Sequence, residues 1–264
     1  NAAAGQLWDK GANTDARTLY SMAYTAALSS GNNSAACHAL AGLAWCAFVE
    51  KDLIAAQAHA TTCRNLADKT GSLHYRASGL VVSARVAFAQ RDLEEANRLA
   101  LAAIEDGRKA KSAVRYDAQA FLVEIALAKG DPETALRHLN AVYRRDLKDG
   151  GRRAIAAYDL RAGIHLARGK LRLAACVFEK AAGAAESLGN LALYASYLAK
   201  AQRALAEAGA YRAVLKRAAR CESAARAIDN TPLFLEILMS KSWAYRQLRK
   251  PKESQRVLEE VAAV

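Results

Sequence analysis

The sequence predicts an all-α fold, a solenoid of antiparallel helical hairpins, and three observations favour it. Hydrophobic residues make up 53% of the chain, much of that alanine, while aromatic residues make up only 7%. Small side chains at this density suit helices that pack closely against helices. There are only three prolines, all near expected helix boundaries, and no run shows the alternating Val, Ile and Thr of strands. Finally, one helical hairpin recurs along the whole chain.

The clearest copy of this hairpin spans residues 118–143. Two runs with helical apolar periodicity, Ala118–Lys129 and Pro132–Tyr143, flank the pair Gly130-Asp131. Gly130 can adopt the left-handed conformation that ends a helix. Asp131 can cap the next helix, and Pro132 falls in its first turn, where a missing N–H costs nothing. The pattern therefore predicts two antiparallel helices joined by a tight turn.

The break inside each hairpin recurs at a nearly constant interval. Successive breaks are 39 or 40 residues apart and fall near Gly11, Lys51, Arg91, Gly130, Gly169, Gly209 and Arg249. This period predicts a truncated first helix and its partner, then six hairpins: Asn1–Lys10, Asp15–Ser29, Ser34–Asp68, Leu73–Ile104, Ala113–Arg145, Arg153–Leu188, Ala192–Ile228 and Pro232–Ala262. No Gly, Ser or Pro-rich linker interrupts them, so residues 1–264 are predicted to form a single helical-repeat domain. Because the chain opens on asparagine instead of methionine, we expect a fragment of a longer protein.

Small residues recur in register with these breaks. The residues five positions after each break are Ala16, Ala56, Ala96, Ala135, Ala174, Val214 and Ser254. The positions twelve after and seven before each break are also mostly Ala, Val or Cys. Two helix backbones can approach closely only where side chains are small, so we expect these columns to be buried.

These columns resemble the tetratricopeptide repeat: small–small packing in the first helix, Gly-Asp or its like at the turn, then Ala and a large apolar residue. The sharpest copy is LVEIALAKGDPETALRHLNAV. The usual repeat has about 34 residues, and we expect the loops LADKTGS, LKDGG, ESLGN and AIDNTP to supply the extra length. The longer period is similar to that of MalT-type bacterial transcription activators and of some eukaryotic scaffold subunits, although these 264 residues contain neither an ATPase nor a helix-turn-helix segment. The resemblance implies a right-handed superhelical solenoid of antiparallel helix hairpins, with the first helix of each hairpin on the concave side.

Sequence motifs that identify an enzyme do not occur. The sequence has no G-x-G-x-x-G, P-loop, G-x-S-x-G or H-E-x-x-H motif, and its five histidines are spread over different hairpins or helices. The five cysteines form no CxxC pair. Cys63 and Cys221 stand in a small-residue column, and Cys46 and Cys176 lie in similarly apolar runs, so packing explains them. We therefore expect reduced thiols and a cytoplasmic protein, or a nuclear one in a eukaryote. We expect no catalytic residue, metal or cofactor.

The net charge of +12 and the pI near 9.6 favour anionic partners. The basic residues are nevertheless scattered, and the densest cluster, from Arg144 to Arg153, surrounds a loop that also carries acids. This distribution is more typical of solvated helix ends than of a nucleic-acid interface, which disfavours direct nucleic-acid binding. No apolar run is long enough to span a bilayer, so we expect no membrane partner.

One strip on the first helices breaks the regularity of the repeat. The residues six positions before the breaks from Lys51 onward are Trp45, Arg85, Glu124, Gly163, Arg203 and Trp243. Stacking of hairpins needs no such variety, so this strip is the predicted binding groove. Together with nearby charged residues, the predicted site comprises Trp45, Arg85, Asp117, Glu124, Asp159, Lys200, Arg203 and Trp243.

Three functions remain open from the sequence. The leading prediction is a non-catalytic helical-repeat scaffold that binds a peptide or protein partner, for example an acidic one, through the concave groove. The resemblance to MalT-type activators implies an alternative, a region that senses a small-molecule effector such as a sugar, held by Trp45 or Trp243 with nearby acids. Nucleic-acid binding is the third and lacks aromatic–basic interleaving on one strip. A thermal-shift screen with sugars and a salt series on nucleic-acid binding would separate them.

Overall fold

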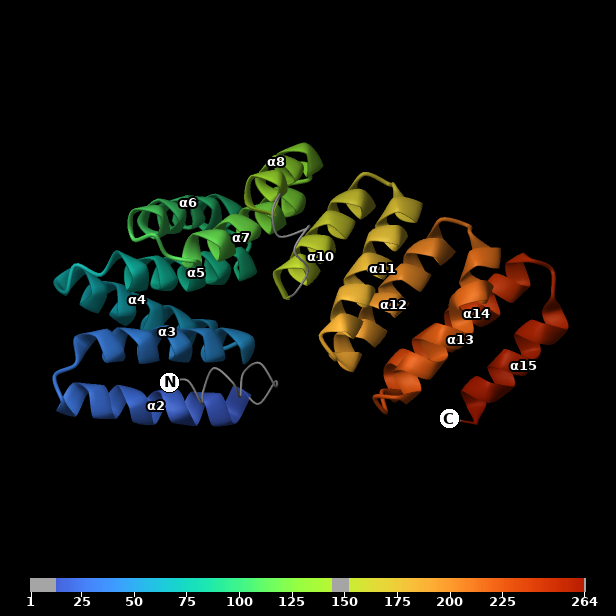
Figure 1. Cartoon of the computed structure of the whole chain (residues 1–264), viewed down its shortest axis with the longest axis horizontal. Coiled ribbons are helices and arrows are strands. Elements are labelled where there is room, and N and C mark those ends of the chain that lie inside the picture. Colours follow the sequence, from blue (N-terminus) through green and yellow to red (C-terminus); the bar gives the residue numbers. More distant parts are fainter. Residues whose placement is uncertain (1–12, 144–151, 264) are drawn as a thin grey trace. The chain divides into compact units, whose positions relative to one another are not determined.

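The fold is an all-α helical repeat (Figure 1). The computed structural model describes residues 13–143 and 152–263, and no strand occurs in these two ranges. Within them the helices are α2 (Asn13–Ser29), α3 (Asn33–Val49), α4 (Leu53–Lys69), α5 (Leu73–Ala89), α6 (Leu93–Lys109), α7 (Val114–Ala128), α8 (Pro132–Tyr143), α10 (Arg152–Ala167), α11 (Leu171–Ser187), α12 (Leu191–Glu207), α13 (Tyr211–Arg226), α14 (Thr231–Gln247) and α15 (Pro251–Ala262). The helices predicted for the partner and for the six hairpins are confirmed within the described ranges, whereas the predicted helix Asn1–Lys10, the hairpin residues Arg144 and Arg145, and the loop LKDGG lie outside them.

Helix length explains the long period. Each of α2 to α6 has 17 residues, and three residues separate one helix from the next. A helix with its turn therefore takes 20 residues, and a hairpin takes 40. The prediction that loops carry the extra length is wrong: LADKTGS belongs largely to α4, which continues to Lys69. Long helices carry it because Ala-rich sequences extend a helix at little cost.

Each described turn between helices contains a left-handed residue, and several of the turns also supply a side-chain helix cap. The chain has a positive φ at Gly31, Gly71, Gly130, Gly169, Gly189 and Gly209, and also at Lys51, Arg91, Lys111, Asp229 and Arg249. After α3, for example, Lys51 has φ of 64°, the Asp52 amide donates to the Ala47 carbonyl at 2.9 Å, and the Asp52 side chain accepts from the Ala55 amide. One turn therefore closes the first helix and caps the second, which fixes the antiparallel hairpin.

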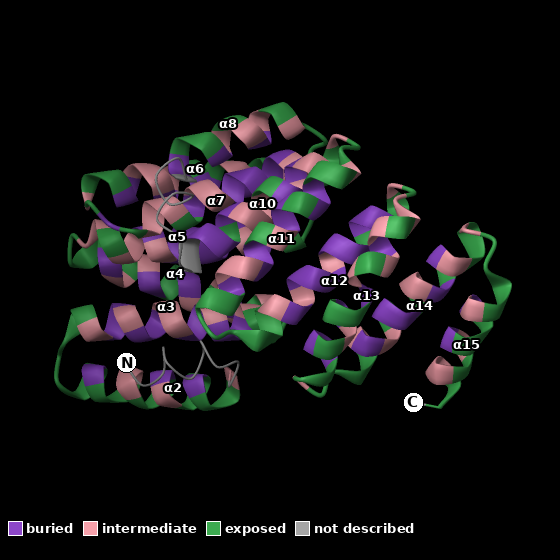
Figure 2. Ribbon diagram, turned by 45° about the vertical axis from the view of Figure 1, so that its right-hand side comes forward, coloured by how far each residue is buried: buried purple, intermediate pink, exposed green. Residues whose placement is uncertain are grey.

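The small-residue columns form the contacts between helices. Ala16, Ala56, Ala96, Ala135, Ala174 and Val214 all have 0% exposure, and Ser254 has 3%. The column seven residues before each break is buried as well, from Ala44 to Ser242. Figure 2 shows buried faces along the helices of each hairpin, with exposed residues on the opposite faces. The predicted burial is confirmed for these two columns, whereas the column twelve residues after each break is buried from Cys63 to Cys221 but only half-buried at Ala23 and Val261.

Three polar residues stand in the buried columns of the last two hairpins, and each forms hydrogen bonds there. Gln202, with 1% exposure, donates to the Ile237 carbonyl at 3.1 Å and to the Ser240 hydroxyl at 2.7 Å. Ser242 and Ser254 share a hydroxyl–hydroxyl hydrogen bond of 2.9 Å. Such bonds offset part of the cost of burying these polar groups.

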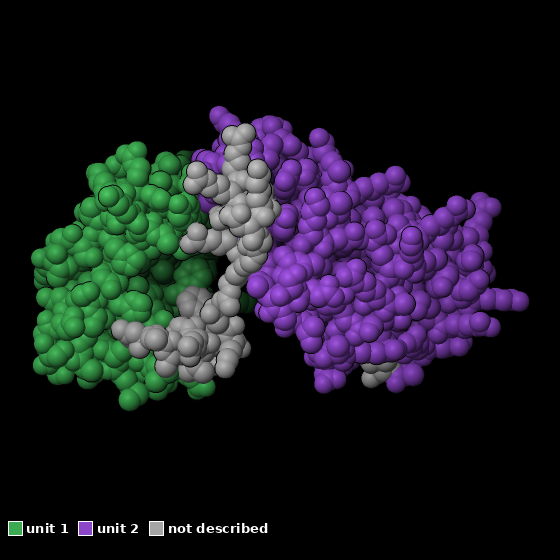
Figure 3. Space-filling model, in the orientation of Figure 1, with its two compact units in different colours: residues 1–129 green, residues 130–264 purple. Residues whose placement is uncertain are grey.

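The chain comprises two compact units, unit 1 (Asn1–Lys129) and unit 2 (Gly130–Val264) (Figure 3). In unit 1, α3 contacts α5 and α5 contacts α7; in unit 2, α12 contacts α14. First helices of successive hairpins thus touch one another, from α3 to α7 in unit 1 and from α12 to α14 in unit 2. The single-domain assignment of residues 1–264 stays a prediction. None of the described helices combines the length and the apolarity that a membrane span requires.

Candidate functional site

The first helices of unit 1 bring three of the predicted residues together. Trp45 of α3, Arg85 of α5 and Glu124 of α7 occupy the same position of three consecutive hairpins. The Arg85 guanidinium lies 5.1 Å from the centre of the Trp45 ring, and its Nη2 is 3.5 Å from Glu124 Oε1. The same guanidinium lies 4.5 Å from the ring centre of Phe121. The predicted strip is therefore a contiguous row in this unit.

Arg85 itself is held firmly in this row. Its side chain is only 20% exposed, and two aromatic rings and one carboxylate surround it. Cation–π contacts of this kind stabilise by about 0.5–1 kcal/mol each when partly exposed. Arg85 is therefore a packing residue of the row, and it is a poor candidate for capturing an anionic partner. Asp117 lies on the exposed surface of α7, seven residues before Glu124 and thus near the same face.

Unit 2 pairs two more of the predicted residues. Lys200 Nζ of α12 donates to Asp159 Oδ1 of α10 at 2.8 Å. The ammonium also lies 4.8 Å from the Tyr197 ring centre and 5.6 Å from that of Phe178. Burial, and next the negative charge of Asp159, raises the pKa of the Tyr197 hydroxyl, which therefore stays protonated. Lys200 and Asp159 thus form an ion pair without net charge, and the ammonium lies over the rings of Tyr197 and Phe178.

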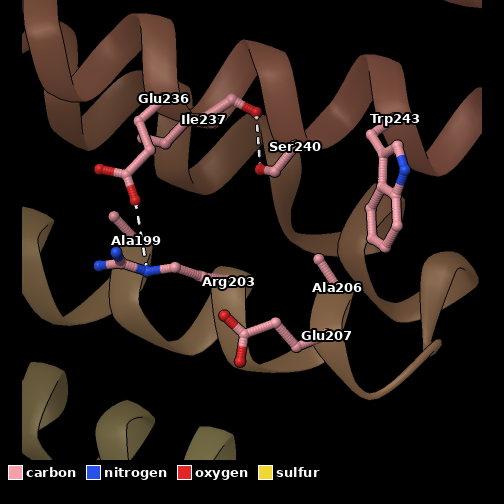
Figure 4. Close-up of a pocket in the computed structure, with 8 residues that line it drawn as sticks. All are labelled: Ala199, Arg203, Ala206, Glu207, Glu236, Ile237, Ser240 and Trp243. Atoms are coloured by element: carbon pink, nitrogen blue, oxygen red, sulfur yellow. Dashed lines mark hydrogen bonds and ion pairs between the residues drawn. The ribbon is translucent and has the colours of Figure 1, made fainter.

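A small pocket lies between α12 and α14, and it contains the other two predicted residues (Figure 4). Its volume is about 260 Å³, and its lining residues are Ala199, Arg203, Ala206, Glu207, Glu236, Ile237, Ser240 and Trp243. Ala199, Ala206, Ile237 and the Trp243 ring form the apolar part of the wall. Trp243 is 40% exposed and meets the Tyr211 ring edge-on at 5.1 Å. The pocket can take one apolar side chain of a partner.

Charged groups lie beside the apolar part of this pocket. Arg203 Nε is 3.5 Å from Glu236 Oε1, with 58% and 45% of the two side chains exposed. Ion pairs this exposed contribute about 0–1 kcal/mol, so an incoming carboxylate can replace Glu236 at little cost. Glu207 contributes a second carboxylate. Arg203 is thus better placed than Arg85 to bind a partner.

Several residues of these sites do not follow from the six-before-the-break position alone. Phe121, Glu207 and Ser240 lie three residues before Glu124, four after Arg203 and three before Trp243. Helical spacing places residues three and four apart on one face. These residues could therefore have been found in the sequence by taking the positions three and four residues before and after each residue of the predicted strip.

The thiols and histidines of the described residues show no arrangement that points to catalysis. Cys37, Cys46, Cys63 and Cys221 are buried free thiols, and burial raises the pKa of Cys63 and of Cys221 to about 12, which disfavours the reactive thiolate. The interpretation of Cys176 as a packing residue is wrong, since it is exposed. His74 Nδ1 lies 2.6 Å from the Ser112 hydroxyl. That hydroxyl is buried and also accepts from the Val114 amide at the start of α7, which is a structural role. No group of three metal-ligating side chains gathers in the described parts of the chain.

Comparisons with known proteins establish the fold class. The sequence matches no protein-family model and no curated protein. Among solved structures, a Podospora anserina protein described as a putative kinesin light chain with nearly identical TPR-like repeats has a TM-score of 0.58 at 18% identity, over 71% of this chain and 93% of its own. RapI in its apo form has a TM-score of 0.59 at 10% identity, over 98% and 97%. A STAND-class signal transduction ATPase of Pyrococcus horikoshii with a tetratricopeptide repeat sensor has a TM-score of 0.67 at 14% identity, over 99% of this chain.

The chain therefore has the tetratricopeptide-like helical-repeat fold. It spans 41% of the length of the P. horikoshii protein. Identities of 10 to 18% show the fold alone. The predicted similarity to MalT-type activators stays a prediction.

Proposed function

We propose that this chain is a non-catalytic scaffold that binds an extended segment of a protein partner along its first helices. The observation that carries the proposal is the pocket between α12 and α14, where an exposed tryptophan, small apolar walls and an exposed arginine lie side by side. Tryptophan and arginine are among the residues that dominate protein interfaces. The segment we expect places one apolar side chain against Trp243 and a carboxylate against Arg203.

The size of the pocket favours a side chain over a free small molecule. Pockets for drug-sized ligands typically span about 300–1,000 Å³, and this one, at about 260 Å³, is smaller and open. A peptide can add contacts on either side of it, whereas a small ligand depends on the pocket alone.

Peptide binding by two variants tests this proposal. A peptide array identifies binders, and fluorescence anisotropy then measures their affinity for the wild type, Trp243→Ala and Arg203→Ala. We expect Trp243→Ala to weaken binding by about 2 kcal/mol or more, and Arg203→Ala by about 1–3 kcal/mol. Arg98→Ala is the matched control, because Arg98 is an exposed, ion-paired arginine on α6, a second helix of unit 1. If both pocket variants bind like the wild type, the segment binds elsewhere and the proposal is refuted.

One observation supports a second function, the sensing of a sugar-like effector. The Trp243 ring packs against Tyr211, and the carboxylates of Glu207 and Glu236 line the same pocket. Aromatic faces with carboxylates suit polyhydroxy ligands, and the similar P. horikoshii protein is described as having a repeat sensor. A thermal-shift screen with sugars decides between the two: stabilisation that disappears in Trp243→Ala would favour the effector over the peptide.

A further inference from the structure

The positive charge of the chain is concentrated in unit 2. Unit 1 contains 14 basic and 12 acidic residues, whereas unit 2 contains 24 basic and 14 acidic residues. The net charges are therefore +2 and +10. The basic residues look scattered along the sequence, but the two units differ strongly in net charge.

The second helices of unit 2 present much of this charge on one face. Ion pairs join Arg217 of α13 to Glu179 of α11, and Arg226 of α13 to Glu260 of α15, so the three helices lie side by side. Their exposed surfaces carry a set of six basic residues, two from each helix, which we call the basic face: Arg172, Lys180, Arg212, Lys216, Lys252 and Arg256. Within the described parts of the chain, none of the six has an ion-pair or hydrogen-bond partner.

Neighbouring carboxylates do not neutralise the basic face, since other arginines already engage them. Glu179 pairs with Arg217, Glu260 with Arg226, and Glu186 with Arg220 at 3.5 Å. Of the other acids on α11, α13 and α15, Glu222 pairs with Lys241 and Glu253 with Lys250, which leaves Glu259. The six cations therefore outnumber the remaining carboxylate, and the described surfaces of these helices keep a strong positive charge.

Helix stability does not account for these residues. Arg172, Arg212 and Lys252 each stand at the second position of a helix, where the positive end of the helix dipole disfavours a cation. The residues that precede these helices, Lys170, Ala210 and Lys250, give no side-chain cap. In unit 1 the corresponding helices α4 and α6 begin with capping Asp52 and Asp92. The helices α11, α13 and α15 of unit 2 thus carry basic residues in their first turns, where acidic residues would stabilise a helix.

We propose that the basic face binds the phosphate backbone of a double-stranded nucleic acid, independently of any peptide on the first helices. A protein interface needs an apolar core with aromatic anchors, and the exposed residues of these three helices include no aromatic ring in the described ranges. The same lack disfavours a single strand, whose bases would stack on aromatic side chains. Cations repeated on successive helices suit a ligand that repeats phosphates, and contacts to phosphates need no base recognition. Direct nucleic-acid binding, disfavoured by the sequence, is therefore favoured by the structure.

The test is anisotropy with a labelled short DNA duplex over a salt series. The first variant combines Arg172→Gln, Arg212→Gln and Lys252→Gln, one change per helix. The second combines Lys180→Gln, Lys216→Gln and Arg256→Gln, one or two turns further along the same helices. We expect each triple variant to weaken binding at least about tenfold near 0.1 M salt and to lower the slope of log K against log salt by about two to three.

A control removes the same charge elsewhere, with Lys69→Gln, Arg98→Gln and Arg108→Gln on the second helices α4 and α6 of unit 1. We expect the control to bind the duplex within about twofold of the wild type, since removed charges that make no phosphate contact change affinity little. All variants first have to show wild-type helicity by circular dichroism. The proposal is overturned if the control loses as much affinity as the triple variants, or if the wild type prefers a single strand. It is also overturned if the wild type binds phosphatidylserine vesicles in preference to the duplex and the triple variants lose that binding.

Discussion

Replacing Arg85 by alanine tests whether this residue stabilises the fold or binds a partner. Its guanidinium contacts the Trp45 and Phe121 rings, and removing both contacts costs about 1–2 kcal/mol. The ion pair with Glu124, at 3.5 Å, adds about 0–1 kcal/mol. The largely buried aliphatic part of the side chain packs as well, so Arg85→Ala should lower the free energy of unfolding by about 1–3 kcal/mol.

Arg203 is the matched comparison, because it occupies the same repeat position but is 58% exposed and lies 3.5 Å from Glu236. Arg203→Ala should therefore change stability by less than about 0.5 kcal/mol. Urea unfolding followed by circular dichroism measures both changes, and Arg85→Lys, which keeps the charge but loses the planar stack, should fall between wild type and Arg85→Ala. Equal destabilisation by Arg85→Ala and Arg203→Ala would refute the assignment of Arg85 to packing.

Two further predictions concern the turns and the histidines. Arg91 has a φ of 69°, so Arg91→Gly should stabilise the chain by about 0.5–1 kcal/mol, and Gly71→Ala, at φ of 68° with open space around it, should destabilise it by about 1 kcal/mol. Urea midpoints that move in the opposite directions would contradict the role given to the turns. Burial lowers the pKa of a set of histidines below the ordinary value near 6.5: His38, His59, His138 and His165. The unfolded chain then binds more protons, so stability should fall as pH drops from 7 through the ordinary pKa toward the lowered values, and His59→Gln should flatten that fall in urea titrations.

The packing of this chain was predictable from sequence because packing repeats. Ala56 and Ala96 stand in the same column and meet the same constraint, so the sequence identifies a buried contact wherever small residues recur at the repeat period. The environment of Arg85 was not predictable in the same way. It depends on Phe121, which comes from the next hairpin and belongs to no regular column.

The burial of Cys176 was predicted wrongly because only its neighbours in the sequence were considered, and not the equivalent positions of the other repeats. Cys176 lies seven positions after the Gly169 break, and the corresponding residues of the following hairpins are Lys216 and Arg256, both exposed. Apolar neighbours along the chain predicted a buried thiol, whereas the column indicates an exposed one. The column is the better guide because a solenoid gives equivalent positions equivalent surroundings.

The charge of the exposed columns also differs between the two units. Three positions after each break, every residue is exposed, and the order along the chain is Thr14, Ile54, Glu94, Glu133, Arg172, Arg212 and Lys252. Packing imposes nothing on these side chains, and at the start of a helix the dipole favours acids such as Glu94. Neither packing nor helix stability therefore explains why the last three residues of this column, Arg172, Arg212 and Lys252, are all basic. A polyanionic partner supplies a reason, and the salt dependence of the triple variants tests it directly.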